Sequence, residues 1–133
     1  MGQLTSKLTL VSTDILPSES LSSSVEEVTS IVAPSTGLSL ALAAATGGSD
    51  VAIKSATATA TQFVYIRHTS KQGDGTTDSD AADELVVKFG STDTLRLLPG
   101  EFAFFPCKSD VAVNIISGTA RIIQVEHAAF TRG

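Results

Sequence analysis

Apolar and polar side chains alternate in several short segments of this chain, which is the pattern of β-strands with one buried face. Residues 38–42 follow it throughout, with Leu, Ser, Leu, Ala and Leu in turn. Residues 63–68 add aromatic and β-branched side chains, which also favour strands. We predict strands at residues 7–11, 38–42, 63–68, 85–89, 95–98, 101–105, 111–115 and 119–128.

Residues 19–33 allow two interpretations. Val25, Val28 and Val32 would share one face of a helix that opens near Ser24. The many β-branched and serine side chains favour an irregular strand instead, and we predict that strand. Residues 51–61 can also be extended, although their small side chains would fill a core poorly.

Proline and glycine separate these segments. Pro17 and Pro34 each predict a turn in the first third of the chain. Ser117 and Gly118 predict a two-residue hairpin turn between two paired strands. In the strand after it, Ile122 and Ile123 make both faces apolar, so we expect that strand to be central in its sheet.

About eight to ten short strands with such punctuation predict an all-β fold. We expect one antiparallel β-sandwich, jelly-roll-like in its connectivity. Residues 1–35 are rich in serine and threonine and are expected to form an N-terminal arm or edge strands. Residues 36–133 are expected to form the sandwich core, with one domain overall.

Composition excludes several classes of protein. The 133 residues carry a net charge of −5, which argues against a protein that binds nucleic acid through phosphate contacts. A single cysteine excludes a disulfide framework and a cysteine-rich zinc site. No apolar run approaches the roughly 18 residues of a membrane span, so no membrane partner is expected. The chain has no tryptophan and one tyrosine, so it has few of the aromatic side chains that line a carbohydrate-binding groove.

The longest polar segment, residues 71–84, is a candidate cation site. Clustered carboxylates can bind Ca²⁺, which takes about six to eight oxygen ligands. The spacing does not match an EF-hand, because Gly75 follows Asp74 directly. We expect a solvated loop without metal, and the weak candidate ligands are Asp74, Asp78, Asp80 and Asp83.

No catalytic constellation stands out, and we expect no enzyme and no cofactor. His68 and His127 are the two imidazoles, but no G-x-S-x-G elbow presents a serine to either. Cys107 precedes Lys108, which could lower the thiol pKa, yet a half-buried small side chain is the favoured interpretation. The segment from Gly73 to Gly75 is expected to be a turn, since no phosphate-loop pattern surrounds it.

The N-terminus formally matches the myristoylation pattern, with Gly2 as the acceptor and Ser6 as the required hydroxyl. Two specified positions match by chance easily in a chain with 17 serines and 16 threonines. An extended arm is the favoured interpretation.

Phenylalanines on both faces of the strand at 101–105 indicate burial on both sides. Phe102 and Phe104 would lie on one face and Phe105 on the other, so one face meets the core and the other a second layer or a partner subunit. Leu8 and Leu10 share one face of the strand in the arm. We predict that Leu8, Leu10, Phe102, Phe104 and Phe105 contact another subunit or a shell.

Residues 60–130 resemble small virion structural proteins of tailed bacteriophages. The resemblance rests on the order of the segments: Phe-Val-Tyr-Ile-Arg-His and a polar loop, then Leu-Val-Val-Lys-Phe-Gly, then a strand that ends in Pro-Gly-Glu before an aromatic strand, and finally two strands that end in Val-Glu-His. Pro-Gly-Glu before a strand also occurs in cupins, but the histidine and carboxylate metal set of cupins is missing. The positions that carry the motif are Pro99, Gly100, Glu101, Phe102, Phe104, Phe105 and Pro106.

The resemblance implies a non-enzymatic component of a virion. A capsid decoration or cement protein fits best, binding the major capsid protein or other virion proteins as a homo-oligomer, with a trimer favoured. The alternatives are a tail, fibre or head-neck protein, or a free ligand-binding β-sandwich module.

Overall fold

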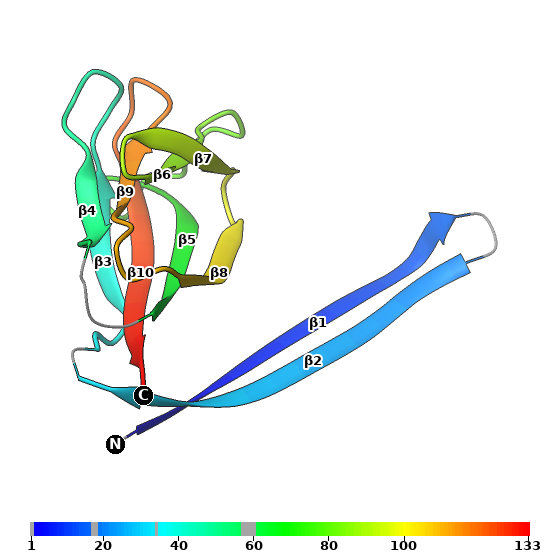
Figure 1. Ribbon diagram of the computed structural model, residues 1–133. Coiled ribbons are helices and arrows are strands. Elements are labelled where there is room, and N and C mark those ends of the chain that lie inside the picture. The colour runs from blue at the N-terminus through cyan, green and yellow to red at the C-terminus, as the bar shows by residue number, and fades with distance from the viewer. Residues whose placement is uncertain (1, 17–18, 34, 57–60) are drawn as a thin grey trace.

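The computed structural model describes residues 2–16, 19–33, 35–56 and 61–133, and these form ten strands in two antiparallel sheets (Figure 1). No helix occurs in this part of the chain. The all-β class and the antiparallel sandwich predicted from alternation are therefore confirmed. The turns predicted at Pro17 and Pro34 fall on residues outside the described ranges, as does part of the segment at 51–61.

The first sheet has six strands in the order β1-β2-β10-β5-β8, and β3 also pairs with β10. These strands are β1 (Gly2–Leu16), β2 (Glu19–Val32), β3 (Ser39–Ala43), β5 (Gln62–Gln72), β8 (Phe102–Cys107) and β10 (Ile123–Arg132). The second sheet has the order β4-β9-β6-β7. Its strands are β4 (Val51–Lys54), β6 (Leu85–Phe89), β7 (Thr92–Leu97) and β9 (Val113–Ser117).

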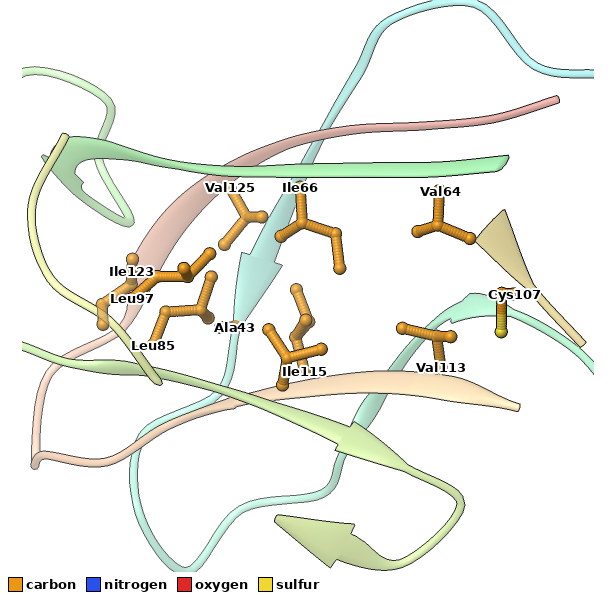
Figure 2. Close-up of a cluster of buried hydrophobic side chains, with 11 residues drawn as sticks. Ala43, Val64, Ile66, Leu85, Leu97, Cys107, Val113, Ile115, Ile123 and Val125 are labelled. Carbon is orange, nitrogen blue, oxygen red and sulfur yellow. The ribbon is translucent and has the colours of Figure 1, made fainter. Parts of the chain in front are cut away.

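The core lies between the two sheets. Val64 and Ile66 of β5 face Leu85 of β6 and Ile115 of β9, and all four are fully buried (Figure 2). Alternation explains the arrangement, because every second residue of each strand points inward. The eleven buried members of this core are Ala43, Val64, Ile66, Leu85, Val87, Leu97, Cys107, Val113, Ile115, Ile123 and Val125.

The eight strands of the sandwich pair in a nested way. The innermost pair is β6 with β7, and then come β5 with β8, β4 with β9, and β3 with β10. Two further pairings, β10 with β5 and β6 with β9, close these four pairs into two sheets. Counted along the sequence from the β6–β7 turn, each strand therefore pairs with the strand at the same position on the other side of that turn.

The first two strands form a long hairpin, which we call the arm (β1 and β2). It leaves the sandwich and projects away from it (Figure 1). Only the last residues of β2 join the sandwich, where Val32 pairs with Thr131 and Ile31 with Arg132 of β10. The strand predicted over residues 19–33 is confirmed, and the helical alternative is wrong.

The hairpin turn predicted at Ser117 and Gly118 is wrong, because β9 and β10 belong to opposite sheets. The backbone here bonds to neighbouring loops instead: Ser117 N–H donates to Ala44 O, and Gly118 N–H donates to Glu84 O. The return strand begins at Ile123 and not at residue 119. Its central place is confirmed, since β10 pairs with β2, β3 and β5.

Candidate functional site

The first sheet carries a broad apolar surface on the side away from the core, which we call the outer face. In β5, Val64 and Ile66 point into the core, so the residues between them point outward. Cross-strand partners share a face, and Tyr65 pairs with Phe104 of β8. The outward apolar side chains come from four strands: Leu40, Leu42, Phe63, Tyr65, Phe102, Phe104 and Phe130.

Several of these side chains are far from buried. Leu40 exposes 61% of its surface, Phe102 57% and Phe104 40%. Soluble monomers expose single apolar residues routinely, but a contiguous set rimmed by polar residues marks an interaction surface.

Aromatic stacking gives the outer face a fixed shape. The rings of Phe63 and Phe104 are stacked with centroids 6.0 Å apart and planes 6° apart. Next to them, the Tyr65 hydroxyl donates to a carboxylate oxygen of Glu126 at 2.8 Å. Partial burial is the larger cause and this contact with Glu126 the second cause of a raised pKa for Tyr65, so the phenol stays neutral. The outer face is therefore an apolar surface with one stacked ring pair and one hydrogen-bonded phenol.

The aromatic residues predicted in β8 point to opposite faces of the sheet, as their alternation requires. Phe102 and Phe104 lie on the outer face, whereas Phe105 packs on the core side with its ring 5.4 Å from that of Phe89. Their role as subunit or shell contacts stays a prediction.

The arm is amphipathic. Leu8 of β1 lies opposite Val25 of β2, and Leu4 and Leu10 occupy the same side of the strand. Leu8 and Leu10 expose 46% and 48% of their surface. The opposite side is mainly polar, with Lys7 opposite Glu26. We call the first side the apolar arm face, and its apolar members are Leu4, Leu8, Leu10, Val25 and Ile31.

The apolar arm face and the outer face belong to the same side of one sheet. Ile31 pairs with Arg132, and Arg132 shares the outward side of β10 with Phe130. The arm nevertheless runs away from the sandwich, so its apolar side does not cover the outer face of its own chain (Figure 1). A shallow hollow marks the junction, lined by Gly2, Ile31, Val32, Ala33 and Ser35.

The four candidate cation ligands in the polar loop do not converge. Asp74 accepts the backbone N–H groups of Thr76 and Thr77 at 2.9 and 2.8 Å, together with the Thr77 hydroxyl. These bonds lower the pKa of Asp74 to about 2. Asp78 pairs with Lys71. Each of these two carboxylates is occupied by a protein partner at its own place in the loop.

The expectation of a solvated loop is wrong at Asp83, whose side chain is only 2% exposed. Asp83 accepts the N–H of Asp80 at 2.9 Å and lies 3.3 Å from Arg121, which also pairs with Asp80. Across the described residues, no three histidine, cysteine, aspartate or glutamate side chains are grouped so that they could hold a metal ion.

His68 serves structure. It is fully buried, and its Nδ1 accepts the N–H of Ser70 at 3.1 Å. Nε2 therefore carries the hydrogen and donates it to Asp83 O at 3.0 Å. Burial lowers the pKa of His68 and also that of His127. With both ring nitrogens of His68 bonded to backbone, this imidazole offers no free nitrogen to a substrate.

Cys107 is a buried core side chain, and burial raises its pKa. Lys108, the neighbour that could have lowered the thiol pKa, has an 80% exposed side chain. The cation that acts on the thiol is Lys54, at the end of β4. Sequence reasoning missed Lys54, because a lysine that ends a strand ordinarily lies in solvent.

Lys54 is only 4% exposed and fastens the loop between β8 and β9. Its ammonium donates to the carbonyl oxygens of Lys108 at 3.1 Å, Ser109 at 3.3 Å and Val111 at 2.5 Å, and to that of Ser55 at 3.3 Å.

Sequence reasoning also missed the outward leucines of β3. The alternation at 38–42 was a correct strand signal, but Ala41 and Ala43 pack toward the core while Leu40 and Leu42 face solvent. The signal that could have found them was the size of the side chains, since leucines opposite alanines on one strand place the larger apolar surface on one side.

No protein-family model matches this chain, and no curated protein matches it in sequence. Within the described ranges, no helix is long and apolar enough to cross a membrane.

Proposed function

We propose that this protein is a non-enzymatic structural component of a phage particle, and that it decorates and stabilises the capsid shell. The observation that carries the proposal is the pair of apolar surfaces, the outer face and the apolar arm face, on one small chain. Surfaces of this kind bind other proteins by the area they remove from water.

The strand pairing supports this class of protein. The nested order of β3 to β10 is the order expected when a long antiparallel hairpin is rolled into two sheets, which is how a jelly roll is built. We infer jelly-roll connectivity from it. Jelly rolls recur in viral capsid proteins and also in lectins, so the fold adds support by analogy only.

The polar groups support a structural role as well. His68, Asp83 and Lys54 are used to hold loops to the sandwich. The exposed surface instead offers leucine, valine and phenylalanine side chains. In the proposed role, the arm and the outer face bury these side chains against shell subunits or neighbouring copies and so resist separation of the shell.

Counting copies in purified particles of the source virus tests this proposal. Quantitative mass spectrometry would compare peptides of this protein with those of the major capsid protein. A copy number comparable to that of the major capsid protein supports decoration. A handful of copies per particle favours a tail, fibre or head-neck protein, and absence from particles refutes a virion role.

A further inference from the structure

The strongest unexplained feature of the molecule is that the two apolar surfaces of one chain do not meet in this structure. The arm projects away from the sandwich, so its apolar face does not lie over the outer face of the same chain (Figure 1). An isolated two-stranded hairpin is at best marginally stable in water, so the arm needs a surface to pack on. A second copy of the chain offers such a surface.

We propose that the apolar arm face of one copy packs on the outer face of a second copy. The inference deepens the oligomeric part of the proposed function and commits to a second copy of this chain as the occupant of both surfaces. The contact joins two different surfaces, so it is head-to-tail, and a closed ring would satisfy every arm and every outer face.

The two surfaces match in length. From Leu4 to Leu10 the arm spans about 20 Å at about 3.3 Å per residue. The outer face extends over β3, β10, β5 and β8, which covers about 14 Å between the outermost strand axes, and the side chains widen it further. The leucines of one arm can therefore reach the apolar side chains of all four strands of the outer face.

The two surfaces also match in charge. On the apolar arm face the charged side chain is Glu27, which lies opposite Ser6 between the leucines. On the outer face the cation in line with Tyr65 on β5 is Arg67, which is exposed and whose cross-strand partner on β10 is Glu126. Among the described residues neither of them forms an ion pair within its own chain. Opposite charges within two apolar surfaces fix the register of a contact between them.

Single substitutions of the full chain test each surface against a matched control, with sedimentation velocity as the readout. Leu10→Glu places a charge on the apolar arm face, and Val11→Glu places the same charge one residue away on the other side of the arm. Phe102→Glu alters the outer face, and Ile122→Glu alters an exposed apolar residue outside it. We expect the two surface variants to weaken self-association at least about 100-fold and the two controls to keep it.

Mixing shows whether the contact is arm to face. The Leu10→Glu chain keeps an intact outer face, and the Phe102→Glu chain keeps an intact arm. Each should be monomeric alone, and the mixture should form a heterodimer through one intact contact. Charge exchange gives an independent readout that tolerates the loss of any one variant: Arg67→Glu should weaken association, and Glu27→Arg in the same chain should restore it.

Several results would overturn the inference. One is a wild-type chain that stays monomeric, another is an oligomer that Leu10→Glu and Phe102→Glu leave intact, and a third is a mixture that forms no heterodimer. If the wild-type chain is monomeric yet abundant in particles, the arm packs on another virion protein and the proposed function stands. If it is an arm-exchanged oligomer yet absent from particles, the inference stands and the proposed function fails.

Discussion

Replacing Lys54 by methionine should destabilise the sandwich strongly, although the apolar stem of the side chain is retained. The lysine ends β4, and its ammonium is surrounded by the carbonyl oxygens of residues 55, 108, 109 and 111. Methionine fills nearly the same space but donates no hydrogen bond. The change therefore isolates the role of the ammonium from that of packing.

The expected cost follows from the donors that are lost. An ammonium has three N–H donors, so three of the four carbonyls can be satisfied at once. Hydrogen bonds to charged groups contribute about 1.5 kcal/mol each or more, and the relief of ammonium desolvation in the variant offsets part of the sum. A net loss of about 3 kcal/mol in the free energy of unfolding remains. For a domain of this size that lowers Tm by about 12 °C.

Calorimetry suits this measurement, because the chain has no tryptophan for fluorescence. Lys108→Met is the matched control, since it removes an ammonium from the fastened loop where the side chain is 80% exposed. It should change the stability by less than about 0.5 kcal/mol. If Lys54→Met unfolds within about 1 kcal/mol of the wild type, water replaces the ammonium at these carbonyls and the reasoning is refuted.

Three further predictions concern titration and reactivity. Burial lowers the pKa values of His68 and His127 in the folded state, so the unfolded chain binds more protons below pH about 6.5. Stability should therefore be full above that pH and fall as the pH drops toward the folded pKa values; denaturant unfolding at a series of pH values measures it, and His68→Asn should flatten the slope. The amide resonance of Thr77 should titrate with the Asp74 carboxylate, at a midpoint of about 2 and not at the usual 3.8; a midpoint at 3.8 would show that the turn does not hold the carboxylate. Cys107 should react with a thiol reagent only after unfolding, because it is buried and its pKa is raised; rapid labelling of the native protein would contradict its place in the core.

Strand positions were predictable because they depend on neighbouring residues. The alternation at 85–89 gives β6 with the predicted bounds, and the segment at 101–105 lies within one residue of β8 at its start. Sheet membership depends on residues far apart in sequence, which alternation does not encode. Ser117 and Gly118 have the composition of a hairpin turn. Their N–H groups instead donate to Ala44 O and Glu84 O, and the chain then crosses to the other sheet.

The candidate surface was predictable only in part. Phe102 and Phe104 were assigned one face from alternation alone, and they do share it. Leu40 and Leu42 join them only because β3 pairs with β10 in this register. The engagement of Asp83 by Arg121 was not predictable either, since 38 residues separate the two and no local pattern links them.

The position of β10 also governs when this chain can fold. β10 pairs with β2, β3 and β5, yet the ribosome makes it after all three. Until it emerges, the first sheet lacks the strand that joins its parts, and the partly made chain exposes the leucines and phenylalanines of its neighbours. Nested pairing of distant strands also makes folding slow, on the order of milliseconds to seconds. The first sheet therefore cannot be completed before β10 is made, and a chain that stops short of β10 can be recognised by chaperones and proteases before it competes for a place in any assembly.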